Sequence, residues 1–386
     1  MIGTLKKMLF VAAALIILVI LFVLINRNPE SLPNHEPPIT IKKEFMEGPF
    51  IFYKEKGLEL VKAHVIGNHV ELIKNRIDEK AAYKELYNVH STLEGVHFSF
   101  KVLPKHSVPS DFYPYTSPIL AISDIEGDFE YLNNILKSQG VIDSEYSWTF
   151  GTGRLVVLGD IFDRGNRVTE TFWLLYKLEQ EAALAGGAVH VILGNHEAMA
   201  LSGDDRYLHR KYRIIFDKNR GKFKDYFNNQ TVLGRWLRTK NAIEIIGNIL
   251  FVHGGLSIEL LEWGVPIDQI NELVRNNVDA DIFRKKGATA EEKMVMGSYG
   301  PLWYRGLVDE DLDQEDVDRI LDHFAVEHIV VGHTVVPEVT MLYDKRIIAI
   351  DVDRRNKSGH QALLVENGMF FRVDTESKKL PLHPIQ

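Results

Sequence analysis

The chain has 386 residues, of which 45% are hydrophobic and 25% are charged, and its formal net charge is −8. This length and composition exclude a wholly disordered or collagen-like chain and leave room for about two domains. The absence of cysteine excludes disulfides, iron–sulfur clusters, cysteine-ligated zinc and thiol catalysis, and the negative charge argues against nucleic acid as a partner.

The first element in the chain is an unbroken apolar run from Met8 to Ile25. A helix of about 18 residues is about 27 Å long, which is close to the thickness of a bilayer core. Lys6 and Lys7 precede the run and less positive charge follows it, so the positive-inside rule places the N-terminus in the cytoplasm. We therefore predict a cytoplasmic stub and an uncleaved transmembrane signal anchor over 1–28. A cleaved signal peptide and a buried helix are the alternatives.

Three further regions follow this segment. A polar, Pro-rich stretch predicts a linker over 29–45. Residues 46–115 are predicted to form a small β-rich region, because β-branched and aromatic residues there are interrupted by Gly57 and by Gly67. Over 116–386, short apolar runs alternate with segments of helical period, a pattern that predicts a layered α/β domain.

Residues with metal-binding side chains follow five of the apolar runs. The run ILAIS is followed by Asp124 and Glu126, which at i and i+2 point the same way. The other four runs lead to Asp160, Asn195, His253 and His333. A single Asp at a strand end is usually a cap or turn residue, but functional sites of open α/β sheets gather at the carboxyl ends of strands. Together these residues supply the ligand types of two adjacent divalent cations.

The motifs SDIEGD, GDIFDRG, GNHE, HGG and GHT occur in this order along the chain. They resemble the motifs of the calcineurin-type metallophosphoesterases, in particular the phosphoprotein-phosphatase branch. Two further stretches, GRWLRTK and GPLWYRG, resemble the Shewanella-like protein phosphatases. The resemblance covers about residues 119–353 and implies an αββα sandwich with helical insertions, here preceded by a transmembrane helix and a small β element.

The resemblance also implies a role for each ligand. Asp160 would bridge two divalent metal ions, with Asp124 and Glu126 completing the first site. The second site would be completed by Asn195, His253 and His333. Two such ions would hold a bridging hydroxide for in-line attack on phosphorus and neutralise the phosphoryl oxygens.

Further residues are implied to act on the substrate. His196 would protonate the leaving oxygen, with Asp163 orienting its imidazole. Arg164 and Arg305 would bind the phosphate oxygens, since a guanidinium offers two donors at once. Trp303 and Tyr304 are expected to flank the phosphate pocket, with Tyr304 binding substrate, although packing in the core explains such aromatic residues nearly as well.

One position departs from the pattern of the family. The first motif normally has a histidine where this chain has Glu126. A site of three carboxylates, from Asp124, Glu126 and Asp160, favours manganese or magnesium over iron or zinc. The alternative is that Glu126 is no ligand and that the first site is weak or empty.

Two segments inside the α/β domain are expected to be insertions. Residues 204–244 contain 11 Lys or Arg and 5 Asp or Glu. This basic insertion would either line the site and attract a phosphorylated ligand or an anionic lipid surface, or form a solvated face. Residues 256–321 are predicted to form a second, acid-rich helical insertion. Local signals also predict that Asp128 caps a helix and that Asn367 lies in a hairpin turn.

These features predict a membrane-anchored, dinuclear metallophosphatase that hydrolyses phosphate monoesters, with phosphoproteins as the first substrate class. We expect a single-pass protein of a bacterial-type inner or plasma membrane, with its catalytic domain extracytoplasmic. One alternative is a phosphatase or pyrophosphatase for nucleotides, small molecules or lipid-linked phosphates. A second alternative is a catalytically silent phosphate-binding module.

Overall fold

The computed structural model describes residues 44–67, 69–90, 96–218, 221–282, 284–353 and 359–382. Residues 43–386 form one compact unit. The predicted transmembrane segment and most of the predicted linker lie outside the described residues. Within the described ranges, every helix is too short or too polar to cross a membrane.

The described chain begins with a three-stranded antiparallel sheet, which lies in the region for which the sequence predicts a small β element. Its strands are β1 (Glu44–Lys54), β2 (Gly57–Ile66) and β3 (His69–Ile77). Gly57 has a φ of 109°, and a Cβ on it would collide with the backbone carbonyl of Ile77, so the turn requires glycine. A short helix α2 (Glu79–Ala82) and a hairpin of β4 (Tyr87–His90) and β5 (His97–Phe100) follow.

The first of two six-stranded sheets has the order β17-β16-β15-β7-β8-β9. Its strands are β7 (Ile119–Ile122), β8 (Arg154–Val157), β9 (Ala188–Val191), β15 (Gln361–Glu366), β16 (Met369–Asp374) and β17 (Lys379–Pro381). The three parallel strands β7, β8 and β9 are almost wholly buried, which explains why their sequences are continuous apolar runs. The predicted hairpin turn joins β15 to β16, with Asn367 at a φ of 53° and Gly368 at 75°.

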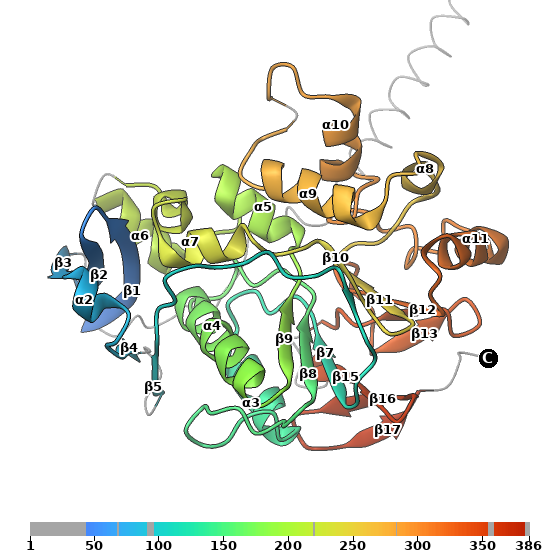
Figure 1. Cartoon of the computed structure of the whole chain (residues 1–386), viewed down its shortest axis with the longest axis horizontal. Helices are drawn as coiled ribbons and strands as arrows, with labels where there is room; N and C mark the ends of the chain where they lie inside the picture. Colours follow the sequence, from blue (N-terminus) through green and yellow to red (C-terminus); the bar gives the residue numbers. More distant parts are fainter. Residues whose placement is uncertain are drawn as a thin grey trace, which may run out of the picture. The chain divides into compact units, whose positions relative to one another are not determined.

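The second six-stranded sheet has the order β13-β14-β12-β11-β10-β6. Its strands are β6 (Phe112–Tyr113), β10 (Ile243–Ile246), β11 (Ile249–Val252), β12 (His328–Val331), β13 (Thr340–Leu342) and β14 (Ile347–Ala349). Helices α3 (Phe129–Ser138) and α4 (Val168–Leu184) lie beside β8 and β9 (Figure 1). The predicted cap is present, since Asp128 Oδ1 accepts a hydrogen bond of 3.0 Å from the amide of Tyr131 at the start of α3. The predicted α/β layers are therefore confirmed.

Both predicted insertions are helical. The basic insertion follows α5 (Asn195–Ser202) and contains α6 (Arg210–Lys218), the 3-10 helix η2 (Phe223–Phe227) and α7 (Val232–Leu237). The second insertion contains α8 (Ile258–Glu262), α9 (Ile267–Asn277), α10 (Ala290–Met296) and α11 (Gln314–Phe324). Helix α5 begins just beyond β9, and α9 and α10 lie on that same side of the sheets (Figure 1).

The β1–β3 sheet packs directly on the basic insertion, beside α6 and α7 (Figure 1). Phe50 of β1 is 2% exposed, and its ring centroid lies 4.8 Å from that of Tyr226 and 5.7 Å from that of Phe216. The backbone amide of Tyr53 donates to the carbonyl of Gln230 at 2.7 Å. The N-terminal β region therefore shares a hydrophobic core with the α/β domain.

Several cations of the basic insertion form ion pairs rather than a free positive surface. Lys211 pairs with Glu47 of β1, and both side chains are buried. Lys240 pairs with Glu179 of α4 at 2.7 Å. Arg238 pairs with Asp279 at 2.9 Å. These pairs fasten the insertion to its neighbours, so part of its positive charge is structural.

Candidate metal centre and active site

The structure brings the predicted ligands together where five strands end. Asp124 and Glu126 follow β7, Asp160 follows β8, and Asn195 follows β9. His253 follows β11 and His333 follows β12, in the second sheet. Since all five strands end on one side of the molecule, residues far apart in the sequence form one cluster.

Asp160 is the centre of this cluster. Two groups of side chains have ligand atoms within 4.8 Å of one another, and Asp160 belongs to both. One group adds His253 and His333, and the other adds Glu126 and His196. Asp160 Oδ1 lies 3.3 Å from His253 Nε2, which in turn lies 2.9 Å from Asn195 Oδ1. Asp160 is therefore the carboxylate that the two groups share.

Asp124 lies beside these groups and is 3% exposed. Its Oδ2 atom accepts hydrogen bonds from the hydroxyl of Ser123 and, at 3.1 Å, from the amide of His333. Burial raises the pKa of Asp124 to about 6, and the nearby carboxylates of Asp160 and Glu126 contribute to that rise. A bound cation would stabilise the ionised carboxylates that repel each other here.

His333 is ready to act as a metal ligand. Its Nε2 atom is buried and has no hydrogen-bond partner among the described residues. Burial and the charge of His253 lower the pKa of His333 to about 2, so its imidazole is neutral. Neutral imidazole is the form that binds metal ions, and a buried nitrogen without a partner is costly unless a ligand meets it. The donor set thus fits divalent cations.

His253 differs from His333 in its protonation. Burial alone would lower its pKa, but the carboxylate of Asp160 raises it to about 10. Its Nδ1 atom donates to the carbonyl of Leu158 at 2.5 Å, which leaves Nε2 facing Asp160. Binding a cation at Nε2 would release a proton, because a ligating imidazole must be neutral.

The backbone of the site is strained. Among the described residues, fourteen non-glycine residues have a positive φ, and six of them are predicted site residues. These six are Asp124, Glu126, Asp160, Asp163, Arg164 and His333. Each such conformation costs about 1 to 3 kcal/mol and persists only where surrounding contacts hold it.

Glu197 provides such contacts, and the sequence analysis did not identify it. Its side chain is 0% exposed, and its two carboxylate oxygens accept 2.8 Å hydrogen bonds from the amides of Asp160, Ile161 and Gly194. Its position at N3 of α5 could have indicated the bond to the amide of the N-cap residue Gly194, whereas its bonds to Asp160 and Ile161 join residues that are distant in the sequence.

His196 and Asp163 form the pair that the sequence predicts. His196 Nδ1 donates to Asp163 Oδ2 at 2.7 Å, and His196 Nε2 lies 3.8 Å from Asp160 Oδ2. Burial would lower the pKa of His196, but Asp160 and then Asp163 raise it to about 9. His196 is therefore protonated at neutral pH and held with Nε2 toward the cluster.

Both predicted phosphate-binding arginines reach the cluster. Arg164 pairs with Glu126 and remains 47% exposed, and its guanidinium lies 5.6 Å from the ring centroid of Tyr207. Arg305 donates to the carbonyl of His333 at 2.8 Å. Tyr207 also lies near the predicted acid, with its ring centroid 5.3 Å from that of His196. Tyr207 was not identified from the sequence, where it is one aromatic residue in a polar stretch.

Tyr304 lies against the turn that follows His253. Its ring packs against Gly255 and Gly306, and burial, followed by the carboxylates of Glu259 and Asp311, raises its pKa to about 12. Trp303 is the aromatic neighbour of the metal-binding residues, with its ring centroid 6.0 Å from that of His333.

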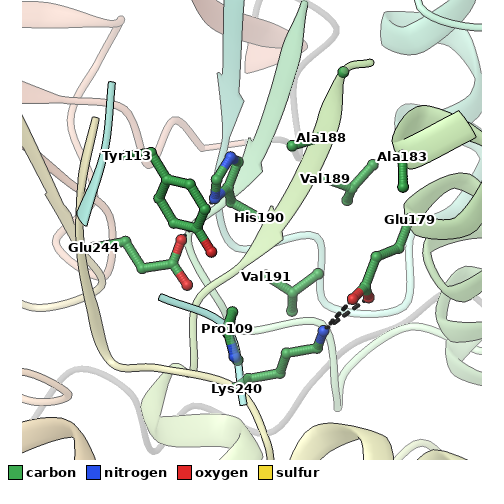
Figure 2. Close-up of a pocket in the computed structure, with 11 residues that line it drawn as sticks. Pro109, Tyr113, Glu179, Ala183, Ala188, Val189, His190, Val191, Lys240 and Glu244 are labelled. Atoms are coloured by element: carbon green, nitrogen blue, oxygen red, sulfur yellow. Dashed lines mark hydrogen bonds and ion pairs between the residues drawn. The ribbon is translucent and has the colours of Figure 1, made fainter. Parts of the chain in front are cut away.

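A pocket of about 170 Å³ lies at the edge strand β9, and none of its lining residues belongs to the cluster (Figure 2). Its polar groups are paired: Lys240 Nζ reaches Glu179 at 2.7 Å, and His190 Nδ1 lies 2.6 Å from Glu244 Oε2. His190 Nε2 also lies 2.8 Å from the guanidinium of Arg154. These contacts join the two sheets. Each of the ionisable side chains named here is paired, so none is left to bind a ligand.

Comparisons of sequence agree with this geometry. A family profile described as calcineurin-like phosphoesterase matches residues 117–337. Shewanella-like protein phosphatase 2 of Arabidopsis thaliana is 27% identical in an alignment of length 264, which covers 56% of this chain and 66% of that protein. The match thus spans just under two thirds of the Arabidopsis relative. Shewanella-like protein phosphatase 1 of Plasmodium berghei is 29% identical, over 61% of this chain and 68% of the relative.

A comparison of structures gives a longer match. The crystal structure of a cold-active protein-tyrosine phosphatase from a psychrophilic Shewanella species superposes with a TM-score of 0.78 at 34% identity. The superposition covers 88% of this chain and 100% of that protein. It therefore extends beyond the part of the chain that the family profile matches.

Proposed function

The chain belongs to the calcineurin-like phosphoesterase family, whose members are metal-dependent phosphoesterases, and on this premise we propose that it hydrolyses phosphate monoesters with two divalent metal ions. The observation that supports the second ion is the membership of Asp160 in both ligand groups. His253, His333 and Asn195 would hold one ion, and Glu126 with Asp124 the other.

The two ions would lower the pKa of the attacking water and neutralise the phosphoryl oxygens. The chain's own residues do the rest. His196 directs Nε2 toward the cluster, and the carboxylate of Asp163 favours the charged form of its imidazole, so it would donate a proton to the leaving oxygen. Asp163 holds the imidazole through Nδ1, which keeps Nε2 directed to the substrate. Arg164 and Arg305, on two sides of the cluster, bind the phosphate oxygens.

The metals of the proposed enzyme are manganese or magnesium. Glu126 stands where the family pattern has histidine, and its carboxylate lies with the carboxylate of Asp160 and the imidazole of His196 in one ligand group. Replacing a nitrogen ligand by a carboxylate favours harder cations. If Glu126 is not a ligand, its pairing with Arg164 is its main role, and the first ion binds weakly.

Phosphoproteins are the proposed substrates. The relatives named above are protein phosphatases, and the Shewanella structure is that of a protein-tyrosine phosphatase. Tyr207 supplies an aromatic surface beside His196 and Arg164, as a phosphotyrosine ring would require. Nucleotides, small phosphate esters and lipid-linked phosphates form the alternative substrate class, and a silent phosphate-binding module is the alternative without catalysis.

The apolar run over Met8–Ile25 supports a further part of the proposal. We propose that it anchors the chain in a membrane, with the phosphatase domain on the extracytoplasmic side. Protease added to intact spheroplasts should then cleave the domain. Cleavage of the domain only after lysis would show the opposite orientation, with the domain in the cytoplasm.

Turnover of an aryl phosphate tests the proposed activity. The full chain is stripped of metal with a chelator, refilled with manganese, and compared with His196→Asn and with His106→Asn, a histidine outside the cluster. We expect manganese-dependent turnover that falls by about 10²- to 10⁴-fold in His196→Asn and is unchanged in His106→Asn. A folded protein with no turnover under any metal, on phosphopeptides, nucleotides or lipid phosphates, would favour the silent module. The ranking of kcat/KM within that panel decides between the two substrate classes.

A further inference from the structure

The chain segment 160–167, called here the clamp loop, carries Asp160, Asp163 and the phosphate-binding Arg164. Its conformation is strained, with φ values of 51° at Asp160, 71° at Asp163 and 51° at Arg164. Strained backbone of this kind reverts unless surrounding groups hold it. The contacts that hold the loop therefore decide where Arg164 points.

Two of these contacts come from the basic insertion. The amide of Arg164 donates to the carbonyl of Tyr207 at 2.9 Å. Lys211 Nζ, at the start of α6, donates to the carbonyl of Asn166. On the other side, the amide of Gly165 donates to the carbonyl of Glu126 at 2.7 Å. The amide of Arg167 donates to the carbonyl of Gly127 at 3.2 Å. The insertion thus holds one side of the loop, and the segment after β7 holds the other.

Lys211 can hold Asn166 only because β1 supplies a counter-charge. Its side chain is 4% exposed, and it pairs with Glu47, which is 2% exposed. An ammonium group buried to this extent is stable only when a charge or strong acceptor compensates for lost water. Glu170 of α4 adds a second carboxylate nearby. Of these two carboxylates, that of Glu47 comes from outside the α/β sandwich. Glu47 lies at the bulge in the pairing of β1 with β2.

From this chain of contacts we infer that the N-terminal β1–β3 sheet positions the phosphate-binding Arg164, through Glu47, Lys211 and the carbonyl of Asn166. Glu47 and Lys211 are positioning residues in this inference, because neither touches the cluster. The inference rests on the proposed function for the role of Arg164 in binding phosphate. Its structural part, the tethering of the clamp loop by β1, does not depend on that function.

The contacts from Glu47 through Lys211 to the carbonyl of Asn166 are called the relay below. The test uses the full chain and three variants of the relay: Lys211→Met, Glu47→Gln and the two combined. Lys211→Arg serves as the conservative variant, since a guanidinium can still pair with Glu47 and donate to Asn166. Val65→Ala is the matched control. Val65 is 2% exposed in β2, so its truncation loosens the same sheet without touching the relay.

Hydrogen–deuterium exchange is the first readout, because it needs no phosphatase activity. We expect amide exchange in peptides covering 160–168 to rise about tenfold or more in Lys211→Met and Glu47→Gln. The combined variant should add little, since both changes break one relay. Exchange in β11 should stay unchanged, and Lys211→Arg should restore most of the protection. Equal deprotection of 160–168 in Val65→Ala would overturn the inference.

The second readout is kcat/KM for an aryl phosphate. Misplacing Arg164 should lower it about tenfold in Lys211→Met, since small shifts of positioning groups cost one to two orders of magnitude. In an Arg164→Ala background the same change should cost less than about twofold, because the group being positioned is gone. A full tenfold loss in that background would overturn the inference. If the unaltered chain has no activity, the proposed function fails, and hydrogen exchange alone decides on the tether.

Discussion

Glu197→Ala is the substitution whose effect follows most directly from the structure. The carboxylate is fully buried and accepts 2.8 Å hydrogen bonds from the amides of Asp160, Ile161 and Gly194. Alanine leaves these three buried N–H groups without an acceptor, at the turn where β8 ends and where α5 begins. The amide of Phe162 also loses its acceptor, but its bond to Oε1 is long, at 3.4 Å, and adds little.

The magnitude follows from these three groups. An unsatisfied buried donor costs about 1 to 3 kcal/mol, so the simple total is about 3 to 9 kcal/mol. Removing Glu197 also removes the repulsion between its carboxylate and that of Asp160. Burial is the main cause of the raised pKa of Glu197, and this repulsion is the second. We therefore expect a loss near the lower end, about 3 to 5 kcal/mol of unfolding free energy.

Glu197→Gln provides an internal check on this reasoning. One carboxylate oxygen, Oε2, accepts from both Asp160 and Gly194, and Oε1 accepts from Ile161. A glutamine with its carbonyl at the Oε2 position keeps two of the three bonds, so it should cost about 1 to 3 kcal/mol. Glu130→Gln, on an exposed position of α3, is the control and should stay within about 0.5 kcal/mol.

Urea unfolding of the full chain, followed by tryptophan fluorescence, measures these differences. The experiment is done in excess chelator, because bound metal would stabilise the folded state by mass action and mask the loss. A cost below about 1 kcal/mol for Glu197→Ala, or a larger cost for Gln than for Ala, would refute the accounting. With metal present, we expect Glu197→Ala to weaken metal binding about 10- to 100-fold, since Asp160 loses its support.

Three other results are expected. Glu126→His should shift activation from manganese and magnesium toward zinc and iron in metal-titration curves, and strict zinc or iron dependence of the unaltered chain would contradict the assignment. His209 precedes α6, where its Nδ1 accepts the amide of Lys211 at 3.0 Å, and burial and the charge of Lys211 lower its pKa from 6.5 to about 4. Neutral His209 therefore contributes fully to folding stability above pH 6.5, and this contribution is lost as the pH falls toward 4. About 1 kcal/mol of unfolding free energy should disappear between these two pH values, and His209→Asn should remove this pH dependence. Phe50→Ala should cost about 3 to 5 kcal/mol in a single unfolding transition, and a separate early transition of the N-terminal sheet would show that the core is not shared.

The sequence alone determined the local features of the site. Each ligand follows an apolar run directly, as Asp160 follows β8 and His333 follows β12, and parallel strands bring their carboxyl ends to one side. The cap at Asp128 and the hairpin at Asn367 depend on contacts within four residues, so they were also predictable. In these cases the interaction that fixes the structure lies within the same short segment.

Only the tertiary structure decided which distant groups meet. Glu47 and Lys211 are 164 positions apart, and nothing in either segment indicates that β1 will lie against α6. The approach of Trp303 to His333, which is 30 positions further along the chain, depends on how two separate segments pack. The role of Glu197 likewise depends on the approach of β8 to α5. Local propensity is encoded in a few adjacent residues, whereas the partner of a buried charge is chosen by the packing of the whole chain.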